Sequence, residues 1–332
     1  MVNNEAVEDL AAAGQHRHAA LIRFSRGDFR FRMMTQLAAF LVVLIFAGII
    51  VTLAIGAMPA IKAFGWDFFT TSTWNPVTEK FGAFPLIYGT LVTSALAMIV
   101  AVPVGIGIAI FLTELCPRQL KRPIGIAVEL LAGIPSIIYG IWGFFIFAPF
   151  FQATIEPWLI KIFADIPVLQ DLFAGPPYGI GIFTAALILS IMILPFISAV
   201  TRDVFATVPP ILKEAAYGLG CTTWEVMWRI VLPYSRSGVV GGAMLALGRA
   251  LGETMAVTFV VGNAHHINMS LLAPGTTISA TIANEFAEAL GDLYIPALIY
   301  AGLILFFITF VVLASAQLML RSLDARSGGG SK

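Results

Sequence analysis

The apolar positions of this chain gather into six long stretches that are separated by more polar segments. A helix crosses the hydrocarbon core of a bilayer with about 20 consecutive apolar residues. Each stretch reaches that length, so the pattern predicts an all-α integral membrane protein with six transmembrane helices. The predicted spans are Thr35–Ala57, Ile87–Thr113, Ile126–Phe151, Gly179–Val200, Gly238–Gly262 and Tyr294–Leu320.

Composition agrees with a lipid environment. Hydrophobic residues make up 59% of the 332 positions and charged residues only 11%, which is more apolar surface than a soluble domain of this size can bury. The formal net charge is zero, and this argues against nucleic acid as a partner. We therefore expect a multi-pass protein of the cytoplasmic (inner) membrane.

The distribution of the 19 lysine and arginine residues predicts the orientation in the membrane. With the N-terminus in the cytoplasm, fifteen of them lie on that side, Arg249 lies inside a span, and only Lys62, Lys80 and Lys161 lie outside. Such a bias orients membrane proteins, so both termini are predicted to be cytoplasmic. The predicted organisation is a cytoplasmic N-terminal tail at 1–33, a transmembrane domain at 34–321 and a cytoplasmic C-terminal tail at 322–332.

The longest cytoplasmic loop, residues 202–236, begins with the pattern of a short helix. Thr207 is placed to cap this helix, with Pro209 near its first position. Gly218 and Gly220 are placed to end the helix and to turn the chain.

The same loop continues with the pattern of a second helix. Thr222 and Glu225 are spaced as a Thr-x-x-Glu capping box, and Pro233 is expected to end the helix. An apolar face that needs burial contains Trp224, Met227 or Trp228, and Val231. This face would pack on its own bundle, lie among lipid headgroups, or insert into a cytoplasmic partner.

Seven residues of this helical pair stand at a fixed spacing: Glu-Ala-Ala, three residues, Gly, nine residues, Ile, one residue, Leu-Pro. In this the chain resembles the permeases of binding-protein-dependent ABC importers, which carry this EAA signature and have the type I (MetI-like) fold. The resemblance implies that 207–233 is a coupling segment, seated in a cleft of a nucleotide-binding subunit. The matching residues are Glu214, Ala215, Ala216, Gly220, Ile230, Leu232 and Pro233.

The energy source is expected on another protein. None of the six lysines follows a glycine, so the Gly-Lys-Ser/Thr core of a phosphate-binding loop is absent from the sequence. We predict that the chain is not an enzyme by itself and binds no cofactor or metal. ATP and magnesium would bind to a partner ATPase.

One pair of opposite charges lies inside a predicted span. Arg249 and Glu253 are four residues apart, on one face of a continuous helix. Each charge costs about 2.5–3.5 kcal/mol at the centre of a membrane helix, so we expect the two to pair with each other and to face other helices or water. The pair either has a structural role or lies along a pathway for an anion, where Arg249 supplies positive charge that Glu253 partly neutralises.

Three further stretches resemble the PstC-type permeases of phosphate importers: Trp74–Leu91, Gly133–Gly143 and Gly248–Thr254. The resemblance implies that Arg249 and Glu253 take part in phosphate movement by alternating access, in one half of a heterodimeric permease. The implied partners are a sister permease of PstA type, a dimeric ATPase of PstB type and an extracytoplasmic phosphate-binding protein of PstS type.

Two alternatives remain open. A permease for another oxyanion, such as molybdate or sulfate, fits the composition equally well. A secondary transporter predicts inverted repeats or several titratable groups near mid-membrane, whereas the sequence has one such pair and no visible repeat.

The outer loops carry weaker signals. The segment Phe151–Tyr178 has room for a short helix, and His265 with His266 is expected to be solvated because no third metal ligand accompanies the two. The segment Pro59–Phe84 predicts an interfacial or docking surface, because it contains Trp66, Phe68, Phe69 and Trp74.

Overall fold

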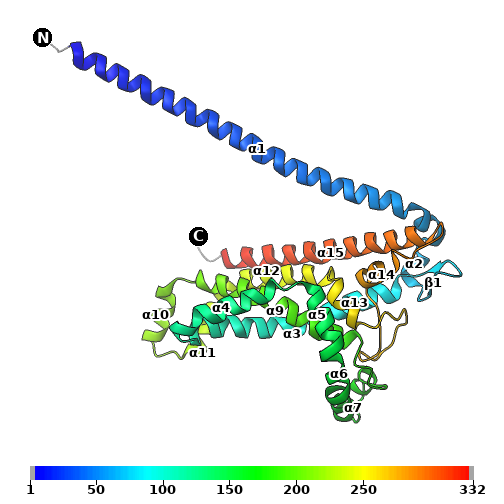
Figure 1. Cartoon of the computed structure of the whole chain (residues 1–332). Helices are drawn as coiled ribbons and strands as arrows, with labels where there is room; N and C mark the ends of the chain where they lie inside the picture. Colours follow the sequence, from blue (N-terminus) through cyan, green and yellow to red (C-terminus); the bar gives the residue numbers. More distant parts are fainter. Residues whose placement is uncertain (1–3, 329–332) are drawn as a thin grey trace. The chain divides into compact units, whose positions relative to one another are not determined.

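The computed structural model describes the backbone of residues 4–328 and the side chains of residues 29–320. Residues 1–3 and 329–332, at the outer ends of the two predicted tails, lie outside the described residues. The regular secondary structure of the described chain is helical apart from one short strand pair (Figure 1). It forms two units, of which the first ends at Ile55 and the second begins at Gly56.

The elements follow one another in this order, with π-helical segments written η. They are α1 (Asn4–Phe64), α2 (Asp67–Thr70), β1 (Trp74–Asn75), β2 (Lys80–Phe81), α3 (Phe84–Ile110), η1 (Phe111–Leu115), α4 (Arg118–Ala132), α5 (Ser136–Trp142), η2 (Gly143–Phe147), α6 (Ala148–Phe150), η3 (Phe151–Ile155), α7 (Glu156–Phe163), α8 (Leu169–Leu172), α9 (Ile182–Ala206), α10 (Pro210–Gly218), α11 (Thr223–Val226), η4 (Met227–Val231), α12 (Leu232–Leu251), α13 (Met255–Val260), α14 (Ile278–Glu285) and α15 (Tyr294–Gly328).

Six helical segments of the described residues are long and apolar enough to cross a membrane, as predicted. The sixth begins at the predicted residue, and its helix α15 continues to Gly328. Helix α1 runs without a break through residue 33, so the boundary of the N-terminal tail stays a prediction. The six segments are Phe29–Phe64, Phe84–Leu115, Ser136–Phe163, Ile182–Ala206, Thr223–Leu251 and Tyr294–Leu320.

The third span differs from its predicted bounds at both ends. Helix α4 stops at Ala132, and Gly133–Pro135 separate it from α5. Proline has no amide to donate and disfavours a helical conformation in the residue before it, so the predicted single span Ile126–Phe151 is wrong. Beyond Phe151 the helix continues through α7, and α8 follows, which confirms a helix in the loop before Tyr178.

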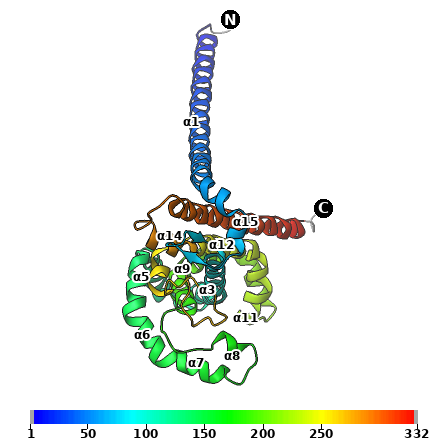
Figure 2. The ribbon, with the colours of Figure 1, turned by 90° about the vertical axis from the view of Figure 1, so that its right-hand side faces the viewer.

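The core of the second unit lies where α3, α5, α9, α12 and α13 meet. Glycines let these backbones approach closely, as expected of small residues at crossings. A Cβ on Gly105 would come 2.7 Å from Ile197, and one on Gly140 would come 3.0 Å from the carbonyl oxygen of Met255. Helices α12 and α15 run side by side (Figures 1 and 2).

The aromatic loop before α3 packs inward, against the prediction of an interfacial or docking surface. Phe68 is fully buried and stacks on Tyr300 with ring centroids 4.5 Å apart. Trp74 is also buried and pairs with Phe81 across the two-stranded hairpin. Trp66, 85% exposed, and Phe84, 45% exposed, are the exposed aromatic residues of the segment Pro59–Phe84. The rings fill the space beside α15, because that helix offers an apolar face to them.

Candidate functional site

The residues singled out from the sequence lie in two regions. The first, called the hairpin, is residues 210–233: α10, α11, η4 and the first two residues of α12. It lies at one end of the bundle, opposite the end that carries β1 (Figure 1). The second, called the fifth-span break, is residues 248–260, where α12 ends and α13 begins.

The first helix of the hairpin ends in a left-handed turn. Helix α10 stops at Gly218, and Gly220 has φ of +85°. The amide of Gly220 donates to the carbonyl of Tyr217 (3.0 Å), and the amide of Cys221 donates to that of Ala216 (3.1 Å). These two bonds form a Schellman motif. Glycine adopts this conformation without Cβ strain, so the predicted helix end and turn are confirmed.

The second helix of the hairpin begins with the predicted capping box. The hydroxyl of Thr222 accepts from the amide of Glu225 (3.3 Å), and the carboxylate of Glu225 accepts from the amide of Thr222 (2.9 Å). Both bonds satisfy amide groups that have no partner within the helix.

Two other predicted helix ends are wrong. Thr207 closes α9, where its hydroxyl donates to the carbonyl of Val204 (2.7 Å), and α10 starts later with Pro210 at its first position. Pro233 does not end the second helix, which continues through η4 and α12 to Leu251. The proline follows a π turn, in the first turn of α12, where its missing amide breaks few regular bonds.

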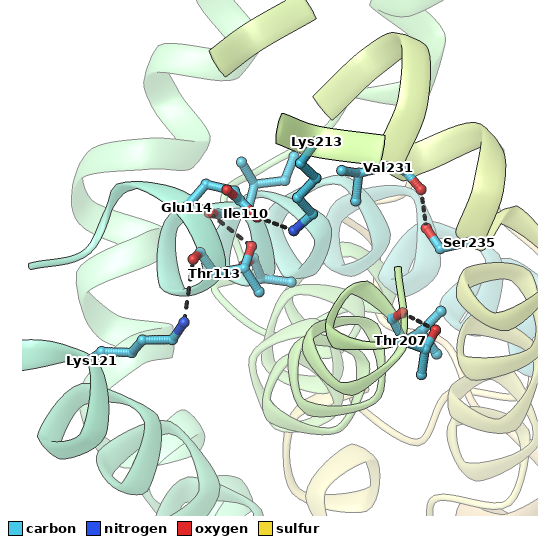
Figure 3. Close-up of polar contacts among 10 residues, drawn as sticks. Ile110, Thr113, Glu114, Lys121, Thr207, Lys213, Val231 and Ser235 are labelled. Atoms are coloured by element: carbon cyan, nitrogen blue, oxygen red, sulfur yellow. Dashed lines mark hydrogen bonds and ion pairs between the residues drawn. The ribbon is translucent and has the colours of Figure 1, made fainter. Parts of the chain in front are cut away.

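The hairpin is fixed to the end of the second span. Lys213 on α10 pairs with Glu114 on η1 at 2.5 Å, and both side chains are largely buried. Figure 3 shows this pair beside the contact of Lys121, whose ammonium donates to the carbonyl of Thr113 (3.3 Å). An ion pair shielded from solvent holds its geometry better than an exposed one. The first helix of the hairpin is therefore positioned by the bundle.

The second helix of the hairpin presents two faces. Val226, Met227 and Val231 are buried against the bundle, whereas Trp224 and Trp228 are 64% and 50% exposed, with ring centroids 5.4 Å apart. The prediction of one shared apolar face is therefore wrong. The wider spiral of η4 changes the angular spacing that an α-helix would give.

The exposed side of the hairpin carries large apolar side chains on both helices. The large exposed side chains are Ile211, Leu212, Tyr217, Leu219, Trp224 and Trp228. A contiguous apolar patch with aromatic residues is typical of a protein interface. The hairpin also holds all seven motif residues: Glu214, Ala215 and Pro233 exposed, Ala216 buried, Ile230 and Leu232 half-buried, and Gly220 in the turn.

Arg249 and Glu253 do not form the predicted ion pair. In the described part of the chain, no nitrogen–oxygen contact within 4 Å joins them. The helix that carries Arg249 ends at Leu251, so the two residues no longer lie on one continuous helix. Arg249 is exposed, while Glu253 is only 9% exposed.

Glu253 lies in a small polar pocket inside the bundle. Its carboxylate accepts from the amide of Ala256 (3.3 Å) and caps the start of α13, and its carbonyl accepts from the hydroxyl of Ser279 on α14 (2.7 Å). The side chains around it leave no room for a water molecule. The hydroxyl of Thr93 is buried there with no hydrogen-bond partner. The further polar residues that line the pocket are Thr90, Ser94 and Thr277.

No prediction from the sequence included these hydroxyl residues. Thr90, Thr93 and Ser94 stand at helical spacing within the apolar second span, and this was a usable signal for a polar stripe. The contribution of α14 carried no such signal, because only the tertiary structure brings Ser279 to Glu253.

A second carboxylate, Glu285, fixes the far end of α14. It accepts from the indole of Trp74 and the hydroxyl of Tyr294, both at 2.7 Å, and pairs with His265 at 3.1 Å. Burial acts to raise the pKa of Glu285, but the hydrogen bonds from these three residues outweigh it and hold the pKa below its usual range. The expectation of a solvated His265 is therefore wrong, because its ring stacks on Trp74.

The chemistry of the fifth-span break suits an anion. A cation inside a membrane span faces water or protein, and exposed Arg249 offers a forked set of donors for an oxyanion. The buried carboxylate of Glu253 stands four residues from it along the chain. No group of three metal-ligand side chains occurs among the described residues.

Comparisons with known proteins identify the family. Residues 101–327 match the family described as "Binding-protein-dependent transport system inner membrane component". The chain is 63% identical to the "Phosphate transport system permease protein PstC" of Mesorhizobium japonicum, over 97% of this chain and 98% of the relative. It is 57% identical to the protein of that name from Pasteurella multocida, over 91% and 94%.

A solved structure agrees in fold. A chain of the bacterial alginate ABC transporter, in complex with its alginate pentasaccharide-bound periplasmic protein, aligns with a TM-score of 0.58 at 21% identity. The alignment covers 86% of this chain and 94% of that one. The family match spans more than half of the chain and the two relatives cover nearly all of it. The chain therefore belongs to the inner-membrane components of binding-protein-dependent transport systems, as the multi-pass permease component of an ABC importer.

Proposed function

We propose that this permease moves inorganic phosphate into the cytoplasm. The observation that carries the proposal is its identity of 57–63% to phosphate transport permeases over more than nine tenths of the chain. An exposed arginine inside a span supports it, because Arg249 matches the charge and the donor geometry of a phosphate oxygen pair.

Arg249 and Glu253 have separate roles in this proposal. Arg249 attracts the anion into the membrane, where a low dielectric strengthens the attraction. Glu253 adds negative charge nearby, which weakens the attraction between Arg249 and phosphate so that phosphate can leave. Its capping bond to α13 also makes the position of the helix break sensitive to the carboxylate.

The partners and the energy source follow from the hairpin. We propose that its exposed apolar face seats in a separate dimeric ATPase, of PstB type, which binds ATP and magnesium, while this chain binds no cofactor. A PstA-type sister permease completes the pathway, and a PstS-type protein delivers phosphate from outside. Alternating access then couples ATP hydrolysis to inward movement. The distribution of basic residues supports cytoplasmic termini.

Transport by the purified complex tests this function. The chain is co-purified with its partners, reconstituted in vesicles, and supplied with ATP and labelled phosphate. Phosphate should accumulate only with ATP, and phosphate with its binding protein should stimulate ATP hydrolysis more than sulfate or molybdate does. Stimulation of ATP hydrolysis by another oxyanion alone would mean that this oxyanion, and not phosphate, is the transported ion. Uptake that persists without ATP would favour a secondary transporter.

A further inference from the structure

A second group of cations surrounds an open pocket between α4 and α9, apart from both regions described above. The pocket has a volume of about 330 Å³. It lies at the end of the bundle that carries the hairpin, because Lys121 contacts Thr113 beside the anchored Glu114. Its lining residues are Arg118, Lys121, Arg122, Gly125, Ile126, Glu129 and Arg202.

The charges of this pocket are not balanced within the described residues. Arg202 is held between Glu129 (2.7 Å) and Asp203 (3.0 Å). Arg118 and Arg122 are exposed, one helical turn apart, and form no ion pair with any residue of the described range. Like charges at this spacing destabilise a helix by about 0.2–0.5 kcal/mol. A bound anion would remove that repulsion.

The backbone leaves room for this arrangement at Gly125. A Cβ there would come 3.3 Å from Nη1 of Arg202, the nitrogen that reaches Glu129. The guanidinium group therefore crosses α4 over a glycine and forms one wall of the pocket. Arg202 is already paired with two carboxylates, so the exposed Arg118 and Arg122 supply the donors.

The position of the pocket matches the depth of lipid headgroups. Arg118 follows the second span by three residues, and Arg202 stands four residues before the end of the fourth. Exposed apolar side chains, Leu120, Ile126 and Leu130, flank the basic face of α4. Basic groups beside apolar ones at a membrane boundary suit a phosphate-bearing headgroup, and an inorganic phosphate ion has the same donor requirement.

We propose that Arg118 and Arg122, with Arg202 as the fixed wall, form a binding site for a phosphate group, from an anionic lipid or from inorganic phosphate. The site is independent of the pathway assigned to Arg249. The forked donors of two arginines match phosphate oxygens bidentately, which a lysine cannot do.

The test measures binding to the full-length chain in the Arg249→Gln background, so that the pathway arginine does not contribute. One arm uses nanodiscs of phosphatidylglycerol and phosphatidylcholine and counts retained lipid by native mass spectrometry. The other uses pure phosphatidylcholine nanodiscs and labelled inorganic phosphate in equilibrium dialysis. The double variant R118Q/R122Q should bind about tenfold less in one arm, which identifies the source of the phosphate group.

The controls separate this site from a general effect of charge. The matched variant K80Q/K161Q removes two exposed cations from other parts of the chain and should bind normally. R118K/R122K keeps the charge without the fork and should fall between R118Q/R122Q and the parent. Unchanged binding in both arms would overturn the proposal. Loss of assembly with the partner subunits, with binding of lipid and inorganic phosphate unchanged, would overturn the proposal. It would indicate that the two arginines contact an acidic surface of a partner protein.

Discussion

The hairpin and the fifth-span break are held by different kinds of contact. In the hairpin, the turn at Gly220 and the box of Thr222 and Glu225 close bonds between residues three to five positions apart. At the break, Glu253 receives a bond from Ser279, 26 positions away, and that helix is fixed in turn by a bond from Ile278 to Thr90, 188 positions away. The turn and the cap of the hairpin are locally encoded, although its Lys213 also pairs with the distant Glu114, while the break depends on the assembled bundle.

This difference predicts how each region fails. A change in the hairpin should alter one turn and leave the six spans in place, because few distant groups depend on it. A change at the break should spread into α3, α13 and α14, because their polar groups share one pocket with Glu253.

The largest expected effect comes from Gly220→Pro in the hairpin. Proline requires φ near −65°, whereas the native φ is +85°, and it removes the amide that bonds to Tyr217. Transport should fall below detection while membrane insertion is unchanged, as measured by ATP-dependent phosphate uptake and by protease protection. Gly218→Ala, at a helical position with open space around it, is the matched control and should remain active. Uptake that survives Gly220→Pro would refute the role of the turn.

Arg249→Gln should have the next largest effect. The substitution keeps hydrogen-bond donors but removes the charge and shortens the side chain, so phosphate uptake should fall by about tenfold or more. Co-purification with the partner subunits should be unchanged, because Arg249 is exposed and forms no ion pair with Glu253. A loss of assembly instead would assign the arginine a structural role.

Two substitutions of Glu253 separate its charge from its cap. Glu253→Gln keeps an oxygen that can accept from Ala256, whereas Glu253→Ala removes that acceptor, at a cost of about 0.5–2 kcal/mol. The glutamine variant should retain the thermal stability of the complex but change its phosphate affinity. The alanine variant should change the phosphate affinity and also lower the thermal stability. Equal melting temperatures for the two variants would show that the cap contributes nothing.

Thr222→Ala should have the smallest effect. It removes the hydroxyl that accepts from the amide of Glu225, and such a cap contributes about 1 kcal/mol. Hydrogen exchange should quicken at the start of α11 only, with slightly weaker coupling of ATP hydrolysis to uptake. Thr52→Ala, on an exposed helix, provides the comparison. Faster exchange at Glu253 as well would mean that the two regions are not independent.

The spans show the same division between local and distant causes. The sixth span begins where hydropathy predicts, because an uncharged apolar run starts at Tyr294. The third and fifth spans differ from prediction, since Pro135 and Gly252 interrupt helices whose apolar pattern continues past them. The prediction for Pro233 is wrong in the opposite sense: the helix continues past this proline, because a π turn accommodates it.

The sequence by itself determined the class of the protein, the number of its spans, the turn at Gly220 and the capping box, since each depends on neighbouring residues or on total apolarity. Only the tertiary structure decided that Arg249 and Glu253 stand apart, that Trp74 and His265 gather on Glu285, and that the hairpin exposes its tryptophans. The physical reason is that most buried polar groups pair with a partner, and the partner depends on which distant segments pack beside them.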